Sequence, residues 1–316
     1  MRGIPLLRKG PIQKWLIHCY CIVRIFFMPL RHIADSFDVV KPEVDSRVVT
    51  ETKCLEGIRA TGYPWQIRHK QTGIVLLLVP PGKFIMGMSQ GDPVGDKSEL
   101  PAREVTISRP FYLGETVVTQ REWSSIIDQN PSCFPERKVS AEKKLLSKGL
   151  TIGEADAMLT PVDKNQLPVE NVSWDAAKEF LQRANLQLPS EAQWEYACRA
   201  GNRAIRYGAL QEIAWYQSNS NKSTQLVRKK KPNQMGFYDM LGNVFEWCED
   251  YFSEFYYREN GMNSTDPTGP TRGTERVLRG GSWDYSAADC RASARSHFIQ
   301  ELRMPFVGFR VMQKLR

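Results

Sequence analysis

Cysteine is the residue type in this chain with the widest chemical reach, and its spacing limits what it can do. Seven cysteines are present, none in a Cys-x-x-Cys pair or at ligand spacing from a histidine, at positions 19, 21, 54, 133, 198, 248 and 290. An odd count without such pairs indicates neither a disulfide framework nor a zinc site. At least one thiol is expected to be free or to pair outside the chain.

The four histidines are scattered, at positions 18, 32, 69 and 297. The sequence contains no His-Glu-x-x-His and no arrangement typical of the facial triad that holds non-haem iron. Redox-metal chemistry would therefore have to use thiolates.

Hard oxygen donors gather in one short stretch. Asp239 and Glu246 flank the Gly242-Asn243 turn, and two carboxylates with nearby backbone carbonyls are a donor set that Ca²⁺ accepts. The alternative is that Asp239 caps the turn and Glu246 pairs with an arginine, and the spacing alone favours this alternative. Four arginines would serve such pairs or line a pocket for an anion: residues 279, 291, 295 and 310.

Capping patterns predict three helices. Thr119 with Glu122, and Ser190 with Gln193, form capping boxes, and Ser173 is a suitable N-cap for a third helix. The predicted helices run from 119 through 127, from 190 until Gly201 stops it, and from 174 to about 185.

Short apolar or alternating runs predict strands: residues 73–79, 84–88, 105–107, 111–114, 244–247, 276–278 and 309–312. The first two flank Pro80, Pro81 and Gly82 and are expected to pair with each other, and the early strands to be antiparallel. Beyond Gly201 the chain is rich in Gly, Asn, Pro and Ser. Such long irregular stretches in a domain indicate dense side-chain hydrogen bonding or a site.

The domain boundaries follow from composition. Residues 1–34 combine a basic start with an apolar stretch and resemble a signal peptide or an uncleaved anchor, so the location is open between cytoplasmic and exported or anchored. Residues 35–62 are polar and predict a linker with one short helix. Residues 63–316 are expected to form the domain, with a Lys- and Glu-rich surface insertion at 133–166.

The net charge of +8 raises the question of nucleic acid. The positive excess sits mainly in the first 33 residues and in the run 228–231, without interleaved aromatic residues that would stack on bases. We therefore expect no nucleic-acid partner, and membrane contact only through residues 1–34.

Six segments occur in an order that resembles a known family. They are Val79-Pro-Pro-Gly-Lys-Phe-Ile-Met-Gly, Leu167-Pro-Val-Glu-Asn-Val-Ser-Trp, Leu188-Pro-Ser-Glu-Ala-Gln-Trp-Glu-Tyr, Gly236-Phe-Tyr-Asp-Met-Leu-Gly-Asn-Val-Phe-Glu-Trp, Arg276-Val-Leu-Arg-Gly-Gly-Ser-Trp and Gly308-Phe-Arg-Val. This series resembles the formylglycine-generating-enzyme (sulfatase-modifying factor) family from about residue 65 onward. The resemblance implies a loop-rich α+β, C-type-lectin-like fold with short antiparallel sheets and three to four helices.

The resemblance also implies a catalytic position, and the chain departs from it. In enzymes of the family, two cysteines five residues apart, shortly after Gly-Gly-Ser, bind Cu(I) and convert a substrate cysteine to formylglycine. Here Tyr285 stands at the first position and Cys290 at the second, while Ser282 matches the family's active-site serine. A phenol cannot replace a soft thiolate. We expect weak Cu(I) binding at most and altered or lost oxidase chemistry.

Calcium is the cofactor that the resemblance favours. It places a structural Ca²⁺ on Asp239, on the backbone carbonyls of Gly242 and Val244, and on Glu246. This implication outweighs the arginine-pair alternative that spacing alone preferred.

Three functions stay open at this point. The chain is an enzyme acting on a protein or peptide such as a sulfatase, or a calcium-stabilised binding module whose recognition surface is formed by residues 283–289 and 296–301. The second arrangement resembles variable lectin-like proteins diversified by retroelements. The third function is a non-catalytic accessory to another protein, and the sequence does not specify an oligomeric state.

Overall fold

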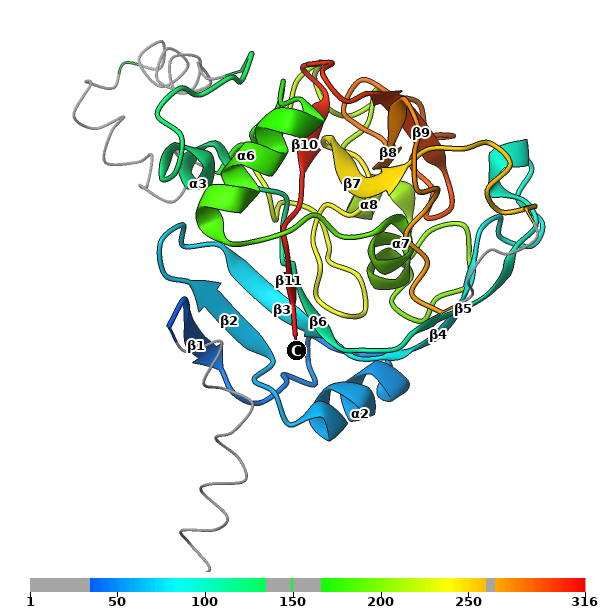
Figure 1. The fold of residues 1–316 in the computed structure, drawn as a ribbon, viewed down its shortest axis with the longest axis horizontal. Coiled ribbons are helices and arrows are strands. Elements are labelled where there is room, and N and C mark those ends of the chain that lie inside the picture. Colours follow the sequence, from blue (N-terminus) through cyan, green and yellow to red (C-terminus); the bar gives the residue numbers. More distant parts are fainter. Residues whose placement is uncertain (1–34, 135–148, 150–165, 260–264, 316) are drawn as a thin grey trace, which may run out of the picture.

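Figure 1 shows the computed structural model, which describes residues 35–134, 149, 166–259 and 265–315. The predicted N-terminal signal or anchor, residues 1–34, and almost all of the predicted insertion lie outside the described residues. Within the described part, no helix combines the length and the apolar character needed to cross a membrane.

The larger sheet joins both ends of the described chain. Its five strands lie in the order β1 (Phe37–Lys41), β2 (Gln66–His69), β3 (Val75–Val79), β6 (Phe111–Gly114) and β11 (Met312–Lys314). All neighbours are antiparallel. Leu77 of β3 lies opposite Leu113 of β6, and both are buried. The short last strand β11 therefore ties the C-terminal region to the centre of the fold (Figure 1).

A four-stranded sheet carries the region of the predicted site. Its order is β10 (Val307–Phe309), β7 (Phe245–Tyr251), β8 (Glu275–Arg279) and β9 (Arg295–Ile299). Strands β10 and β7 are parallel, whereas the other pairs are antiparallel. The expectation of antiparallel sheets is therefore wrong at this pair, because β10 reaches β7 from a distant part of the chain and not through a hairpin turn.

A separate two-stranded sheet corrects one predicted pairing. Strand β4 (Gly82–Met86) pairs with β5 (Arg103–Ile107), and β3 pairs with β2 and β6. The expectation that residues 73–79 pair with 84–88 is wrong. Pro80 and Pro81 have no backbone N–H to donate next to such a hairpin turn, and both edges of β3 are already occupied by other strands.

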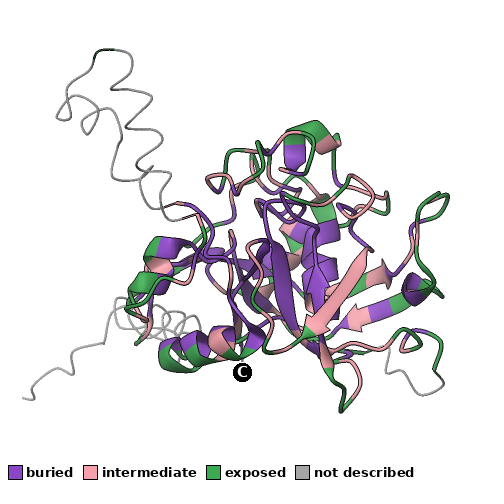
Figure 2. Cartoon of the chain, turned by 90° about the horizontal axis from the view of Figure 1, so that it is seen from above, coloured by how far each residue is buried: buried purple, intermediate pink, exposed green. Residues whose placement is uncertain are grey.

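Five helices are described, and the capping predictions are confirmed. They are α2 (Thr52–Thr61), α3 (Gln120–Ser124), α6 (Trp174–Ala184), α7 (Glu191–Arg199) and α8 (Leu210–Ile213). Thr119 and Ser190 form complete capping boxes, and the Ser173 side chain accepts the Ala176 N–H. The α+β class is confirmed. Helix α7 is almost wholly buried, and Figure 2 shows it among the purple central elements.

Residues 35–62 correct another expectation, because they belong to the folded body and are not a linker. The Phe37 ring lies 5.1 Å from that of His69 in an edge contact. Helix α2 buries Cys54 and Ile58, and the Glu51 carboxylate caps it by accepting the Cys54 N–H. Little periodicity is visible in this segment because β1 buries one residue of five and α2 buries only two residues.

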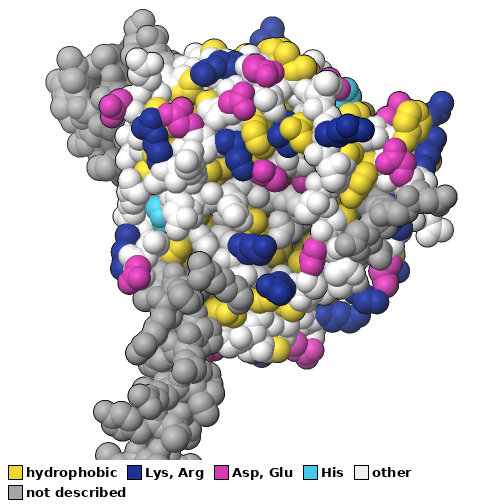
Figure 3. Space-filling view, viewed as in Figure 1, with side chains coloured by type: hydrophobic (Ala, Val, Ile, Leu, Met, Phe, Trp, Pro, Cys, Tyr) yellow, Lys and Arg dark blue, Asp and Glu magenta, His cyan; other side chains and the backbone are white. Residues whose placement is uncertain are grey.

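Buried arginine–glutamate pairs connect these elements. Arg310 donates to both carboxylate oxygens of Glu246, at 2.7 and 2.9 Å. The same kind of pair recurs between buried side chains: Arg279–Glu195, Arg291–Glu99 and Arg295–Glu191. All four arginines identified in the sequence are therefore paired with carboxylates. On the face seen in Figure 3, the exposed charged side chains of both signs are interspersed.

We predict that Arg310→Met destabilises the protein by about 3–5 kcal/mol, because Glu246 would keep a buried charge without a cationic partner. The measurement is urea unfolding at neutral pH. The control is Arg183→Met, which breaks the exposed Arg183–Glu179 pair and is expected to cost less than about 1 kcal/mol. Similar losses in the two variants would contradict the prediction.

Candidate functional site

The turn after β8 brings Ser282 and Cys290 together. Gly280 and Gly281 have φ values of 98° and 77°, which favour glycine. A Cβ atom on Gly281 would lie 2.7 Å from the Cys290 Sγ. The Ser282 backbone also lies close enough to this sulfur to oppose the rise in the pKa of the thiol. The thiol is therefore held against the Gly281–Ser282 backbone.

Cys290 is in a poor state for metal binding or nucleophilic attack. Its side chain is fully buried, and this burial raises the pKa of the thiol to about 12. The reactive and metal-binding form of cysteine is the thiolate. At neutral pH, Cys290 is a protonated core residue.

Tyr285 makes its contacts with other aromatic rings and not with Ser282 or Cys290. Its half-buried ring packs edge-on against Phe245, with 4.8 Å between centroids, and against Phe306 at 5.2 Å. Its hydroxyl has no hydrogen-bond partner among the described residues, and burial raises its pKa. The Ser282 hydroxyl is buried and accepts the Asp284 N–H at 3.3 Å. The three predicted catalytic residues share one turn, but no hydrogen bond joins Tyr285 to the other two in the described part.

Tyr285 belongs to a set of aromatic rings whose contacts were not predicted from the sequence. Successive edge or tilted contacts link these rings, which we call the aromatic group: Phe245, Tyr285, Phe298 and Phe306, with the pair Phe134 and Trp283 beside them. Phe306 contacts both Tyr285 and Phe298. It therefore joins the two stretches predicted as a recognition surface, 283–289 and 296–301.

Glu170 is a buried carboxylate beside this region that sequence reasoning missed. Its Oε1 accepts the Phe134 N–H at 3.0 Å, and its Oε2 has no partner among the described residues. Burial raises its pKa to about 7. Only its place inside the Leu-Pro-Val-Glu motif would have drawn attention to it.

The predicted calcium loop has both features of the alternative reading. The Asp239 Oδ2 accepts the Arg228 N–H at 2.9 Å, and burial raises the pKa of this carboxyl to about 6. Both oxygens of Glu246 are used by Arg310, and Oε2 also accepts the Trp194 Nε1–H at 2.8 Å.

The two carboxylates predicted to bind calcium already have protein partners in the structure. Arg310 provides the positive charge that calcium would supply to Glu246. No group of three or more His, Cys, Asp or Glu side chains in the described part has the geometry of a metal site. Calcium binding at Asp239 and Glu246 stays a prediction.

Comparisons with known proteins show relatives with different names. The chain is 31% identical over 222 residues to "Serine/threonine-protein kinase pkn1" of Chlamydia pneumoniae, covering 70% of this chain but only 35% of the kinase. It is 28% identical over 276 residues to the formylglycine-generating enzyme of Streptomyces coelicolor, covering 73% of this chain and 87% of the enzyme.

Two solved structures have a similar fold. Treponema denticola variable protein 1 matches with a TM-score of 0.60 and 26% identity, covering 76% of this chain and 95% of that one. PvdO from Pseudomonas aeruginosa matches with a TM-score of 0.62 and 21% identity, covering 79% and 98%.

The family described as "Sulfatase-modifying factor enzyme 1-like domain" matches residues 64–315. This range begins just before β2 and ends just after the last strand β11, so it contains the six motifs and the Ser282–Cys290 turn. The elements β1 and α2 precede the matched range in the sequence. The chain belongs to the sulfatase-modifying factor enzyme 1-like domain family.

Proposed function

We propose that this chain has lost copper-dependent cysteine oxidation and binds a peptide segment of another protein on the aromatic group around Tyr285. The observation that carries the proposal is the packing of the Tyr285 ring against Phe245 and Phe306. This ring stands where the family resemblance places the first copper cysteine. The scaffold is taken as C-type-lectin-like, as the resemblance implies.

The protonation states support the loss of oxidation. Cu(I) is selected by soft, deprotonated sulfur ligands. Burial keeps Cys290 protonated, and the pKa of Tyr285 is raised by burial and by the nearby Asp289 and Asp284. Neither side chain offers an anionic soft donor at neutral pH.

The surface beside Tyr285 supports a binding role. Aromatic side chains contribute large contact areas in interfaces, and a few of them often carry most of the affinity. Tyr285, Phe298 and Phe134 are half-buried, so part of each ring is open to solvent. A relative named as a serine/threonine-protein kinase also supports a binding or accessory role, because that name describes a chemistry other than cysteine oxidation.

The oxidase remains the second candidate because Ser282 and Cys290 adjoin and several relatives are named formylglycine-generating enzymes. We expect no aldehyde when the protein is incubated with a cysteine-bearing sulfatase peptide, Cu(I) and oxygen, as judged by mass spectrometry. Cys290→Ala is the matched control. Aldehyde formation that needs Cys290 would contradict the proposed loss of oxidation.

Tyr285→Cys tests the effect of a cysteine at the first copper position, and we expect this variant to bind more copper than the natural protein.

The thiols should differ in reactivity. Cys133 is exposed and Cys290 is buried, so iodoacetamide at pH 8 is expected to label Cys133 well before Cys290. Peptide mapping by mass spectrometry reads the two sites, and labelling in urea shows that both peptides are detectable. Equally fast labelling of Cys290 in the folded protein would contradict the burial of its thiol.

Peptide binding is tested by fluorescence polarisation with the same sulfatase peptide and a copy in which serine replaces its cysteine. We expect the two peptides to bind alike without added copper, and Tyr285→Ala to weaken both by about tenfold through loss of ring contacts. Phe255→Ala, which truncates an exposed ring outside the aromatic group, is the control. Binding that needs the peptide thiol and copper would instead favour the oxidase.

A further inference from the structure

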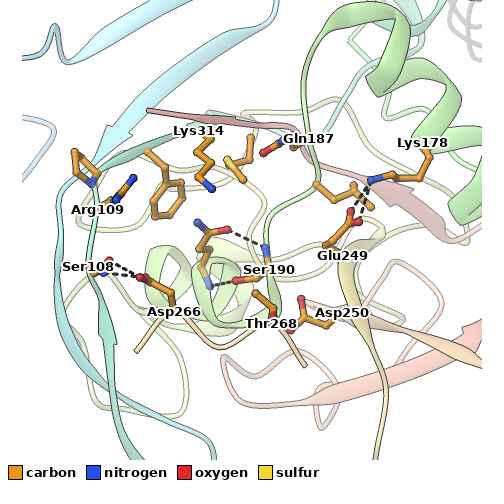
Figure 4. Close-up of a pocket in the computed structure, with 15 residues that line it drawn as sticks. Ser108, Arg109, Lys178, Gln187, Ser190, Glu249, Asp250, Asp266, Thr268 and Lys314 are labelled. Carbon is orange, nitrogen blue, oxygen red and sulfur yellow. Dashed lines mark hydrogen bonds and ion pairs between the residues drawn. The ribbon is translucent and has the colours of Figure 1, made fainter. Parts of the chain in front are cut away.

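A concave site lies between the five-stranded sheet and the start of α7. Its volume is about 570 Å³, within the range of small-molecule pockets. It is bounded by residues 108–111, which connect β5 to β6, by the start of α7, and by β11 (Figure 4). None of its lining residues belongs to the aromatic group or is Ser282 or Cys290.

Part of the cavity wall is apolar. Phe111, Leu188 and Met312 line it and are otherwise buried, with exposed fractions of 5% or less. They come from β6, from the segment before α7 and from β11. Such a wall favours an apolar ligand body over an inorganic ion.

Most of the acidic groups at the cavity are already satisfied. Lys178 donates to both oxygens of Glu249, at 2.8 and 3.0 Å. Asp266 accepts the Ser108 N–H at 2.9 Å and also the Ser108 hydroxyl. Figure 4 draws both sets of contacts inside the pocket lining.

Two cations at the cavity are not satisfied in this way. Arg109 and Lys314 are exposed, and neither side chain has an ion-pair partner among the described residues. In Figure 4 they lie on the same side of the cavity, on the segment after β5 and on β11. Together they create a positive region next to the apolar wall.

Asp250 does not cancel this positive region at neutral pH. It lines the cavity, its exposed fraction is 3%, and its Oδ2 accepts the Glu191 N–H at 2.9 Å. Burial first, and then the neighbouring Glu191, raise its pKa to about 8. The carboxyl is therefore mostly protonated at pH 7 and is able to donate a hydrogen bond.

We infer that this cavity binds a small organic anion, with its carboxylate held by Arg109 and Lys314 and its apolar body on Phe111, Leu188 and Met312. A guanidinium and an ammonium group both donate strongly to a carboxylate. A cationic ligand is disfavoured because Lys178 already neutralises Glu249, which leaves Asp266 as one anion against the two cations Arg109 and Lys314. The inference rests on this cavity alone and does not depend on the proposed peptide surface.

The experiment is isothermal titration of the full chain with indole-3-acetate and with its neutral amide, indole-3-acetamide. We expect indole-3-acetate to bind and the amide to have an affinity at least about tenfold lower, because only the acid pairs with the two cations. Acetate and inorganic phosphate are controls that carry a negative charge but lack the apolar indole ring. If they bind as tightly as indole-3-acetate, the site is a general anion site and the inference is overturned.

The matched variants locate the binding. R109Q/K314Q is expected to weaken indole-3-acetate binding by about tenfold or more. The control R59Q/K222Q removes the same charge from exposed positions that do not line the cavity, and should leave binding unchanged. No binding by the natural protein, or equal binding by both double variants, would overturn the inference.

Asp250 gives the binding a pH dependence with a defined sign. The groups around it are Glu191 of α7, Arg295 of β9, Tyr256, and Cys248 and Glu249 of its own strand β7. Because its folded pKa is raised, the carboxyl is protonated below about pH 8 and becomes a repelling anion above it. Indole-3-acetate should therefore bind more weakly at pH 9 than at pH 7. Asp250→Asn should bind equally at both pH values, and a persistent drop in that variant would exclude this role for Asp250.

Discussion

The buried pairing of arginine with glutamate is the interaction on which the rest of this structure depends. After α7 the chain has few regular elements, so many backbone carbonyls need partners from side chains. Arg310 bonds Glu246 and also the carbonyls of Gly114 and Tyr238, while Arg279 bonds three carbonyls in the segment 292–294. A buried guanidinium is tolerated only with such partners. These groups hold the loops in place of longer strands and helices.

The same constraint limits the chemistry of the candidate site. Glu246 lies next in sequence to Phe245 of the aromatic group, but its carboxylate is committed to Arg310. Gly281 and Ser282 seal Cys290 inside the turn, so the thiol serves the core. The open part of this region is the aromatic face beside Tyr285, and that is why binding is proposed there in preference to oxidation.

The two proposed surfaces differ in chemistry and in place. The aromatic group offers rings on the side of β7 and β10. The cavity lies near β11 and the start of α7. It combines an apolar wall with Arg109 and Lys314, two cations that have no ion-pair partner in the described part of the chain. One surface suits an extended peptide, whereas the other suits a compact anion. Loss of peptide binding at the aromatic group can therefore be distinguished from loss of anion binding at the cavity.

The sequence alone was enough for the family, the α+β class and the capped helices at Thr119, Ser173 and Ser190. These signals are local or lie in short motifs. Tertiary structure decided that residues 35–62 pack, which strands pair, that Arg310 meets Glu246, and that the cavity forms. These contacts join residues far apart in the chain, and several chemically equivalent partners, such as the four arginines, compete for each carboxylate. Only the packed fold selects among them.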